Sequence, residues 1–302
     1  MHGAFGDLPR TRPGDGVLHA PEGAFARGLP DLPAHFFARE RTQALAPGAP
    51  TGLVVLDLSD ALGLAVPAST PCMLGRYIVL RAGESFAHAF AATGEVHYVI
   101  RGQGSSHNGS TAIDWQAGDV FVWPGASHTR HCAGTDSVLF CVTDEPLLAM
   151  LGVPPPAAHA NRVVRAAHYP ADAIDAELEA VHRRTGPQRS AGKAVNFFTP
   201  AAAHKVSLLP TISAGMNTLE PGGRQRPHRH NAAALTLGIQ TDRVHTLIDG
   251  QRYAWEPFAV VVTPARAPHA HYNQGSHMMK SLVLQDGGLF YHLRCTGFSW
   301  ED

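Results

Sequence analysis

RPHRHNAAALTLGI (residues 226–239) and FAVVVTPARAPHAHYN (residues 258–273) are the two stretches that decide the fold. In the first, His228 and His230 stand two residues apart at the head of an apolar run, and such residues share one face of a strand. In the second, a run of valines ends in a proline-containing turn, and His269 follows. The pattern predicts buried strands of one antiparallel barrel that turn their imidazoles inward.

The same histidine spacing predicts a metal site. Histidine is the commonest metal ligand, and two imidazoles on one strand face can hold one ion together with a third from another segment. Three neutral imidazoles leave coordination positions open for a substrate or O₂, which a catalytic metal needs and a structural metal does not. Each histidine alone is more simply a surface or hydrogen-bonded residue, so the prediction for His228, His230 and His269 depends on their combination.

Short apolar runs, rich in β-branched and aromatic residues, fill residues 74–143 and return from residue 194. Runs of this kind, broken by Gly, Asn, Asp and Ser, are typical of antiparallel sandwiches and barrels. The segment Val122-Trp123-Pro124 in the first set corresponds to Val262-Thr263-Pro264 in the second, which indicates an internal duplication. We therefore predict an all-β protein built from two tandem antiparallel barrels.

The predicted organisation has four parts: an N-terminal arm (1–70), a first barrel (71–150), a linker (151–193) and a second barrel (194–302). Within the linker, Ile174, Leu178 and Val181 have helical spacing, and Gly186 suits the end of a helix. A short helix is therefore expected between the barrels.

The HxH and P-x4-H segments resemble the two motifs of cupin barrels. More narrowly, residues 227–239 and 263–273 are similar to segments of gentisate, salicylate and 1-hydroxy-2-naphthoate 1,2-dioxygenases. Residues 118–152, GDVFVWPGASHTRHCAGTDSVLFCVTDEPLLAMLG, are similar to the closing part of the C-terminal cupin of these enzymes. The resemblance implies a bicupin, with two double-stranded β-helices, that opens a hydroxylated aromatic ring with O₂ at a three-histidine Fe(II).

The resemblance also implies roles for single residues. The three histidines named above would bind Fe(II), and His271 would be an acid–base group facing the substrate. An acidic fourth ligand is missing, because Ala233 and Ala234 stand in its places. The dioxygenases of this resemblance lack it as well, which favours them over oxalate-type cupins.

Substrate contacts are expected beside the same segment. The family usually has an arginine just after its S-A-L residues, where it helps to hold the substrate carboxylate, and here that position is Thr236. Arg224, Arg226 or Arg243 would replace it, and Gln285 would reach the barrel interior. The expected partners are a small aromatic acid and O₂.

The first barrel carries a degenerate version of the metal motif. His88 and Glu95 fit ligand positions, but Phe90 replaces the second histidine, and the distal motif PGASH is one residue short at His128. His97 shares a strand face with Glu95. We predict a structural barrel that has lost its metal, and a rearranged His88/Glu95/His97/His128 site stays open as the alternative.

Composition argues against several other classes of protein. The chain has 302 residues, a formal net charge of −1 and four scattered cysteines, with no basic block and no CxxC pair. A nucleic-acid partner, a disulfide framework and a membrane span are not expected, and a cytoplasmic protein is. The resemblance also implies a homo-oligomer, a dimer or tetramer, with residues 1–50 as a possible arm.

Two other functions stay open. A cupin metal site also supports isomerisation, decarboxylation or an oxidative biosynthetic step, and O₂ dependence separates these from ring cleavage. A bicupin that has lost ligands in one barrel can also be a non-enzymatic ligand-binding protein, and metal analysis of the purified protein tests that reading.

Overall fold

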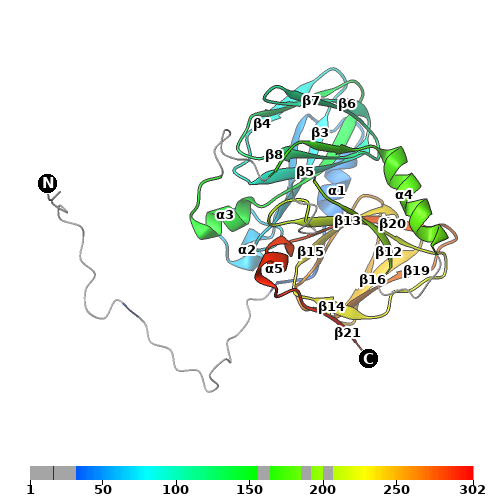
Figure 1. The fold of residues 1–302 in the computed structure, drawn as a ribbon. Coiled ribbons are helices and arrows are strands. Elements are labelled where there is room, and N and C mark those ends of the chain that lie inside the picture. Colours follow the sequence, from blue (N-terminus) through cyan, green and yellow to red (C-terminus); the bar gives the residue numbers. More distant parts are fainter. Residues whose placement is uncertain (1–15, 17–31, 156–163, 185–191, 200–206, 302) are drawn as a thin grey trace. The chain divides into compact units, whose positions relative to one another are not determined.

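The computed structural model describes residues 16, 32–155, 164–184, 192–199 and 207–301. Contacts divide the chain into a unit of residues 1–31 and a unit of residues 32–302, and the second is described below. It contains four antiparallel sheets, two for each predicted barrel (Figure 1). The first 31 residues of the predicted arm, Gly16 apart, lie outside the described residues.

The first barrel pairs a six-stranded sheet with a four-stranded one. The larger sheet runs in the order β11 (Ala167–Tyr169), β8 (Val120–Pro124), β5 (Gly94–Arg101), β10 (Ser137–Thr143), β3 (Leu74–Leu80), β2 (Gly52–Leu56). The smaller sheet runs β4 (Ser85–His88), β9 (Thr129–Ala133), β6 (Gln103–Asn108), β7 (Thr111–Gln116).

The second barrel repeats this plan with six and five strands. The larger sheet runs β1 (His35–Phe36), β18 (Val260–Thr263), β15 (Ala234–Gln240), β20 (Met279–Gln285), β13 (Ser213–Leu219), β12 (Lys193–Phe197). The smaller sheet runs β17 (Gln251–Ala254), β16 (Val244–Ile248), β19 (His269–Asn273), β14 (His228–His230), β21 (Phe298–Trp300). The bicupin architecture expected from the histidine segments is confirmed by these paired sheets.

Five helices are described: α1 (Ala38–Leu45), α2 (Ser59–Leu62), α3 (Glu145–Leu151), α4 (Ala171–Arg183) and α5 (Gly288–Leu293). The helix predicted between the barrels is α4, and it buries Ile174 and Leu178, two of the three residues that predicted it. None of the described helices is both long enough and apolar enough to cross a membrane.

Part of the predicted arm belongs to the sheets. Strand β1 pairs with β18 of the second barrel, and β2 pairs with β3 of the first. The predicted N-terminal arm of residues 1–70 therefore contains one strand of each barrel. The sequence signal is weak there because β1 has two residues and β2 sits at a sheet edge with one face exposed. The other predicted limits stay predictions.

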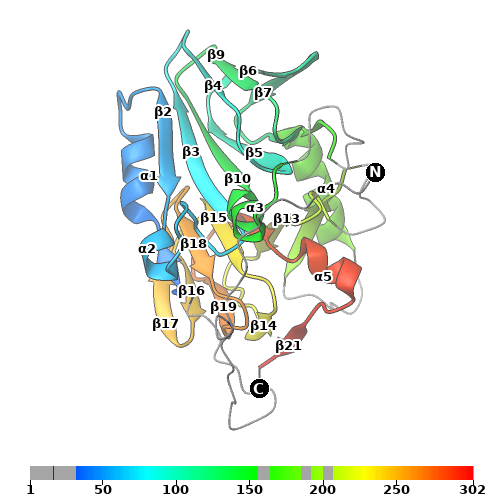
Figure 2. The same cartoon turned by 90° about the vertical axis from the view of Figure 1, so that its left-hand side faces the viewer.

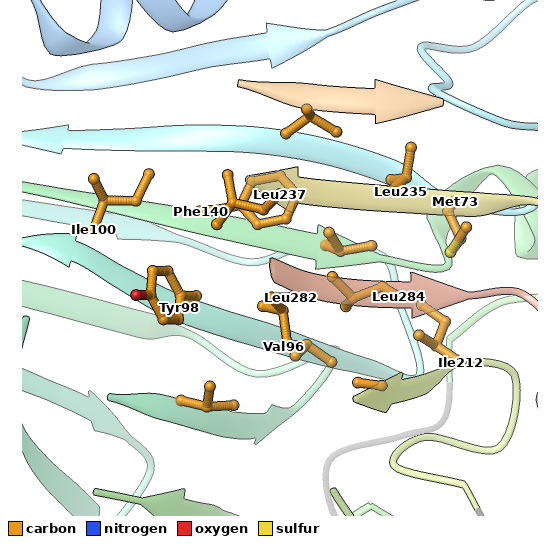
Figure 3. Packing of buried hydrophobic residues seen from close by; sticks show 14 of the residues in the cluster. Met73, Val96, Tyr98, Ile100, Phe140, Ile212, Leu235, Leu237, Leu282 and Leu284 are labelled. Atoms are coloured by element: carbon orange, nitrogen blue, oxygen red, sulfur yellow. The ribbon is translucent and has the colours of Figure 1, made fainter. Parts of the chain in front are cut away.

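The two six-stranded sheets share one hydrophobic core. Side chains from β5 and β10 of the first barrel and from β15 and β20 of the second belong to one buried cluster. Figure 3 shows Phe140 and Val96 beside Leu237 and Leu282 in this layer. Figures 1 and 2 place the smaller sheets at opposite ends of this unit, beyond the shared core.

Strand alternation explains why the barrels differ inside. In β10, Phe140 faces the shared core while its neighbours Leu139 and Cys141 face a second apolar cluster that fills the first barrel. In β15, Leu235 faces the shared core, but the alternate residue Thr236 lines a cavity. The interior of the first barrel is therefore packed, whereas the second has room for a ligand.

Candidate metal centre and its cavity

His228, His230 and His269 converge inside the second barrel. Strand β14 supplies the first two, and the register of β14 on β19 pairs His228 directly with His269. One ligand atom from each residue lies within 4.8 Å of the others, the only such trio of His, Cys, Asp or Glu in the described part of the chain. Two nitrogens that each bind one metal at about 2.1 Å lie at most about 4.2 Å apart, so the three rings would draw closer together around an ion.

Each ligand ring is fixed by a backbone carbonyl. Nδ1 of His228 donates to the Arg226 carbonyl (3.0 Å), Nδ1 of His230 to Ala232 (2.7 Å), and Nδ1 of His269 to Ala267 (2.9 Å). A carbonyl only accepts, so each Nδ1 carries the proton and each Nε2 keeps its lone pair. Metal-binding histidines are held in this way, so the three residues fit a divalent transition metal.

Burial keeps these rings neutral. It lowers the pKa of His269 to about 2, with a further contribution from the neighbouring histidines. Burial also lowers the pKa of His228 and of His230. Neutral imidazoles are the ligating form, so protons do not compete for the site at neutral pH. Three nitrogen donors suit iron, zinc and copper alike, so this geometry alone does not select one metal.

A cavity of about 440 Å³ opens beside the three histidines. That volume suits a single small aromatic molecule. Among the described residues that line it, none is acidic, lysine or arginine, and its polar groups are amides, hydroxyls and imidazoles. Besides the histidines, its polar wall residues include Asn196, Asn217, Gln225, Thr236 and Gln285.

His271 lines the cavity next to the ligands and belongs to a hydrogen-bonded relay. Trp255 Nε1 donates to Thr246 Oγ1 (2.7 Å), and Thr246 Oγ1 lies 2.7 Å from His271 Nδ1. The arrangement that satisfies the hydroxyl has Thr246 donate to Nδ1, which leaves the Nε2 proton free for the cavity. Burial and the neighbouring histidines lower the pKa of His271 to about 3, so the ring is neutral.

Two of the five predicted substrate contacts line the cavity, Thr236 and Gln285. Gln285 Nε2 also lies 3.1 Å from Nε2 of His230. The three predicted arginines, Arg224, Arg226 and Arg243, are exposed and are not among the described residues that line the cavity.

Backbone geometry explains why Arg226 points away from the cavity. Arg226 lies two residues before His228, which in a continuous strand would put both on one face. Strand β14 begins only at His228, and Pro227 breaks the alternation. Arg226 instead lies over the Trp300 ring, 5.4 Å from its centroid. Gln225, which sequence reasoning missed, is the residue buried between the two exposed arginines.

Gln225 has an unsatisfied group. The side chain is 3% exposed and lines the cavity, and its Oε1 atom has no hydrogen-bond partner among the residues that the structure describes. A buried acceptor without a partner is costly unless a ligand or water satisfies it. No sequence motif distinguishes this glutamine, so only the fold reveals it.

The first barrel holds the counterpart of this site in a closed form. The register of β4 on β9 pairs His88 with Thr129, just as His228 pairs with His269, so a threonine replaces the third ligand. Phe90 stacks on His88 with ring centroids 3.8 Å apart. His128 is exposed, which removes it from the predicted rearranged site.

His131, which the sequence reading passed over, joins the cluster instead. Its Nε2 lies 3.1 Å from Nε2 of His88, and its Nδ1 lies 2.6 Å from Ser106 Oγ, which accepts a hydrogen bond from Trp115 (2.7 Å). Serine, tryptophan and histidine have the same sequence separations, 9 and 25 residues, as in the relay of His271. This repeat supports an internal duplication.

Comparisons with known proteins agree with this arrangement. The solved salicylate 1,2-dioxygenase of Pseudaminobacter salicylatoxidans superposes with a TM-score of 0.75, covering 92% of this chain and 91% of that one at 14% identity. A cupin barrel protein of Leptotrichia buccalis superposes with a TM-score of 0.52, at 12% identity, over 82% of this chain and 94% of that one. The chain has the bicupin fold.

Curated relatives add sequence similarity over part of this bicupin. A 5-aminosalicylate 1,2-dioxygenase of Comamonas is 34% identical over 36% of this chain and 29% of its own length. A 1-hydroxy-2-naphthoate 1,2-dioxygenase of Nocardioides is 27% identical over 50% of this chain and 38% of its own length. No protein-family model matches the chain. The resemblance expected from the histidine segments is confirmed, and the matches span less than half of these relatives.

Proposed function

We propose that this bicupin is a non-haem iron dioxygenase that cleaves the ring of a hydroxylated aromatic acid with O₂. The observation that carries the proposal is the trio His228, His230 and His269, in which every Nδ1 is fixed on a carbonyl and every Nε2 keeps its lone pair. The names of the relatives, which are 1,2-dioxygenases of aminosalicylate, hydroxynaphthoate and gentisate, support the reaction class.

Iron is the metal we propose, on the strength of that similarity. When bound, Fe(II) would supply a doubly charged centre that attracts an ortho-hydroxy carboxylate and permits reaction with O₂. His228, His230 and His269 are the residues that would hold it. Since they are neutral, they leave the positive charge uncompensated, and a carboxylate could bind without an arginine in the described cavity wall.

The other cavity residues would orient the substrate. Gln225 would accept a hydrogen bond from a ring substituent, because its Oε1 has no partner in the described part of the chain. Thr236 and Gln285 line the same space. Holding a substrate in one orientation beside the metal turns an encounter into a directed reaction.

His271 would hold or move a proton at Nε2. Its Nδ1 is engaged by Thr246, so only Nε2 is left to face the cavity. Trp255, which donates to Thr246, fixes the ring orientation from behind. A neutral imidazole in this tautomer can donate a hydrogen bond from Nε2 to a substrate oxygen.

Anaerobic reconstitution tests the proposal. The protein is loaded with Fe(II) and then mixed with O₂ and a panel of salicylates, gentisate, hydroxynaphthoates and aminophenols, while oxygen uptake and loss of ring absorbance are followed. We expect uptake with at least one ortho-hydroxy carboxylate, none in His228→Ala, and unchanged uptake in the surface control His277→Ala. Iron binding without uptake on any member of the panel would contradict ring cleavage.

The alternatives keep the same metal site. Turnover without O₂ would favour an isomerase or decarboxylase, and absence of bound metal would favour a ligand-binding bicupin. The intact trio in the second barrel favours a metal enzyme over the latter. The homo-oligomer and the cytoplasmic location stay predictions.

A further inference from the structure

The strand that carries two of the three histidines is short and has two unequal neighbours. Strand β14 is only three residues long, and a single residue pair joins it to β19. Three pairs join it to β21: His228 with Trp300, Arg229 with Ser299, and His230 with Phe298. The position of the His-x-His segment therefore depends more on the late strand β21 than on the strand of His269.

Aromatic side chains of β21 surround the ring of His228. Phe298 stacks on it with ring centroids 5.2 Å apart and an interplanar angle of 27°. Trp300 meets the same ring edge-on at 5.9 Å, and it contacts Phe298 at 4.9 Å. Phe298 is 53% exposed, so apolar burial does not account for its place beside the site. Stacking limits the rotation of the His228 ring, whose centroid also lies 4.3 Å from that of His269.

Polar contacts fasten the same two segments. Arg229 on β14 donates through Nε and Nη2 to both carboxylate oxygens of Glu301, the second contact at 2.6 Å. Glu301 N–H donates to the Pro227 carbonyl (2.8 Å), and Asn231 N–H donates to the Gly297 carbonyl (3.0 Å). A bidentate pair fixes orientation as well as distance. Both ends of the His-x-His segment are therefore tied to residues 297–301.

We propose that β21 is a clasp that holds His228 and His230 in ligating geometry, with Phe298 as the positioning residue of the metal centre. This inference rests on the proposed metal site and deepens it, because it assigns control of metal affinity to residues that donate no ligand. Groups that orient metal-binding histidines commonly change affinity by about 10- to 100-fold when removed.

The test uses Co²⁺ as the probe, because its visible absorption reports ligand geometry as well as occupancy. We expect Phe298→Ala to weaken Co²⁺ binding at least about tenfold and to alter the absorption bands, while Phe298→Tyr, which keeps the ring, retains both. Leu293→Ala is the matched control, because Leu293 is an exposed apolar residue of the neighbouring helix α5. Unfolding temperatures of the metal-free variants separate positioning from a loss of folding.

A charge exchange tests the polar half of the clasp. Arg229→Glu and Glu301→Arg should each weaken Co²⁺ binding, and the double variant should recover most of the loss. Wild-type affinity and spectra in Phe298→Ala and in both single charge variants would overturn the clasp and leave the dioxygenase proposal standing. The dioxygenase proposal alone would be overturned if the wild type binds Co²⁺ and the variants lose affinity as expected, but the Fe(II)-loaded wild type consumes no O₂. Wild-type protein that binds no metal would overturn both.

Discussion

Gln285 Nε2 lies 3.1 Å from Nε2 of His230, the nitrogen that a metal would take. With Nδ1 of His230 donating to a carbonyl, Nε2 is an acceptor and the Gln285 amide donates to it. A metal must displace this hydrogen bond. Gln285 therefore competes with a metal for Nε2 of His230, and it also lines the substrate cavity.

Gln285→Leu should bind metal more tightly. The variant loses a hydrogen bond that exists only in the metal-free state, worth about 1 kcal/mol, which corresponds to roughly fivefold in affinity. Competition with a chelator of known affinity measures the change, and Gln251→Leu, an exposed glutamine of β17, is the control. Weaker binding in Gln285→Leu would show that the amide supports the metal instead of competing with it.

Gln225→Leu should lose discrimination between ring substituents. If Oε1 accepts a hydrogen bond from the substrate, rings bearing an amino or hydroxyl donor should bind wild-type protein more tightly than rings without one. A net hydrogen-bond free energy of roughly 1 kcal/mol corresponds to about fivefold in affinity. Calorimetry with the anaerobic metal-loaded protein and 5-aminosalicylate against salicylate measures the ratio. An equal ratio in the variant and in wild type would place the substituent elsewhere.

Thr246→Val should damage the relay behind His271. It leaves Trp255 Nε1 and His271 Nδ1 buried without their partner, at a cost of about 1–3 kcal/mol in the free energy of unfolding. Thr246→Ser should leave the free energy of unfolding almost unchanged, because Ser106 makes the equivalent hydrogen bonds in the first barrel. Urea unfolding of both variants measures the difference, and equal stability of the valine and serine variants would contradict the relay.

Glu95 should make the first barrel sensitive to pH. Burial raises the pKa of this carboxyl from its ordinary 4.5 to about 7, with smaller opposing contributions from His88 and Arg76. The folded protein holds the proton more tightly than the unfolded chain, so this stabilisation is complete below pH 4.5 and is lost as the pH rises through 7. Glu95→Gln has no proton to lose. Its stability relative to wild type should therefore rise by about 3 kcal/mol at most across that range.

Unfolding measured at several pH values between 4 and 8 tests this. The lowered pKa values of His88 and His97 act in the opposite sense, since they cost stability as the pH falls below 6.5, but both histidines remain in the variant and largely cancel in the comparison. A stability difference that stays constant with pH would show that folding does not raise the pKa of Glu95.

Much of the site could be predicted from the sequence, because two of the residue patterns that mark it lie within short segments. His228 and His230 share a strand face at a spacing of two, and the valines before Pro264 mark the strand that precedes His269. These short-range patterns predicted the barrels, the ligand trio and the helix α4. The family resemblance placed His271 in the cavity, where the structure has it.

The features of the site that the sequence did not predict depend on contacts between segments far apart in the chain. Pro227 ends the alternation that would have turned Arg226 inward, so the buried side chain is Gln225. Residues 297–301 reach the ligands only because β21 pairs with β14. His131 faces His88 because β9 pairs with both β4 and β6, a topology that spacing alone does not reveal.

The number and location of bound metal ions test the central claim most directly. Elemental analysis of the Fe(II)-loaded protein should find one iron per chain in the wild type and in His88→Ala, and none in His269→Ala. That result would place the metal in the second barrel and leave the first as the packed partner. Iron that survives His269→Ala but is lost in His88→Ala would contradict the account.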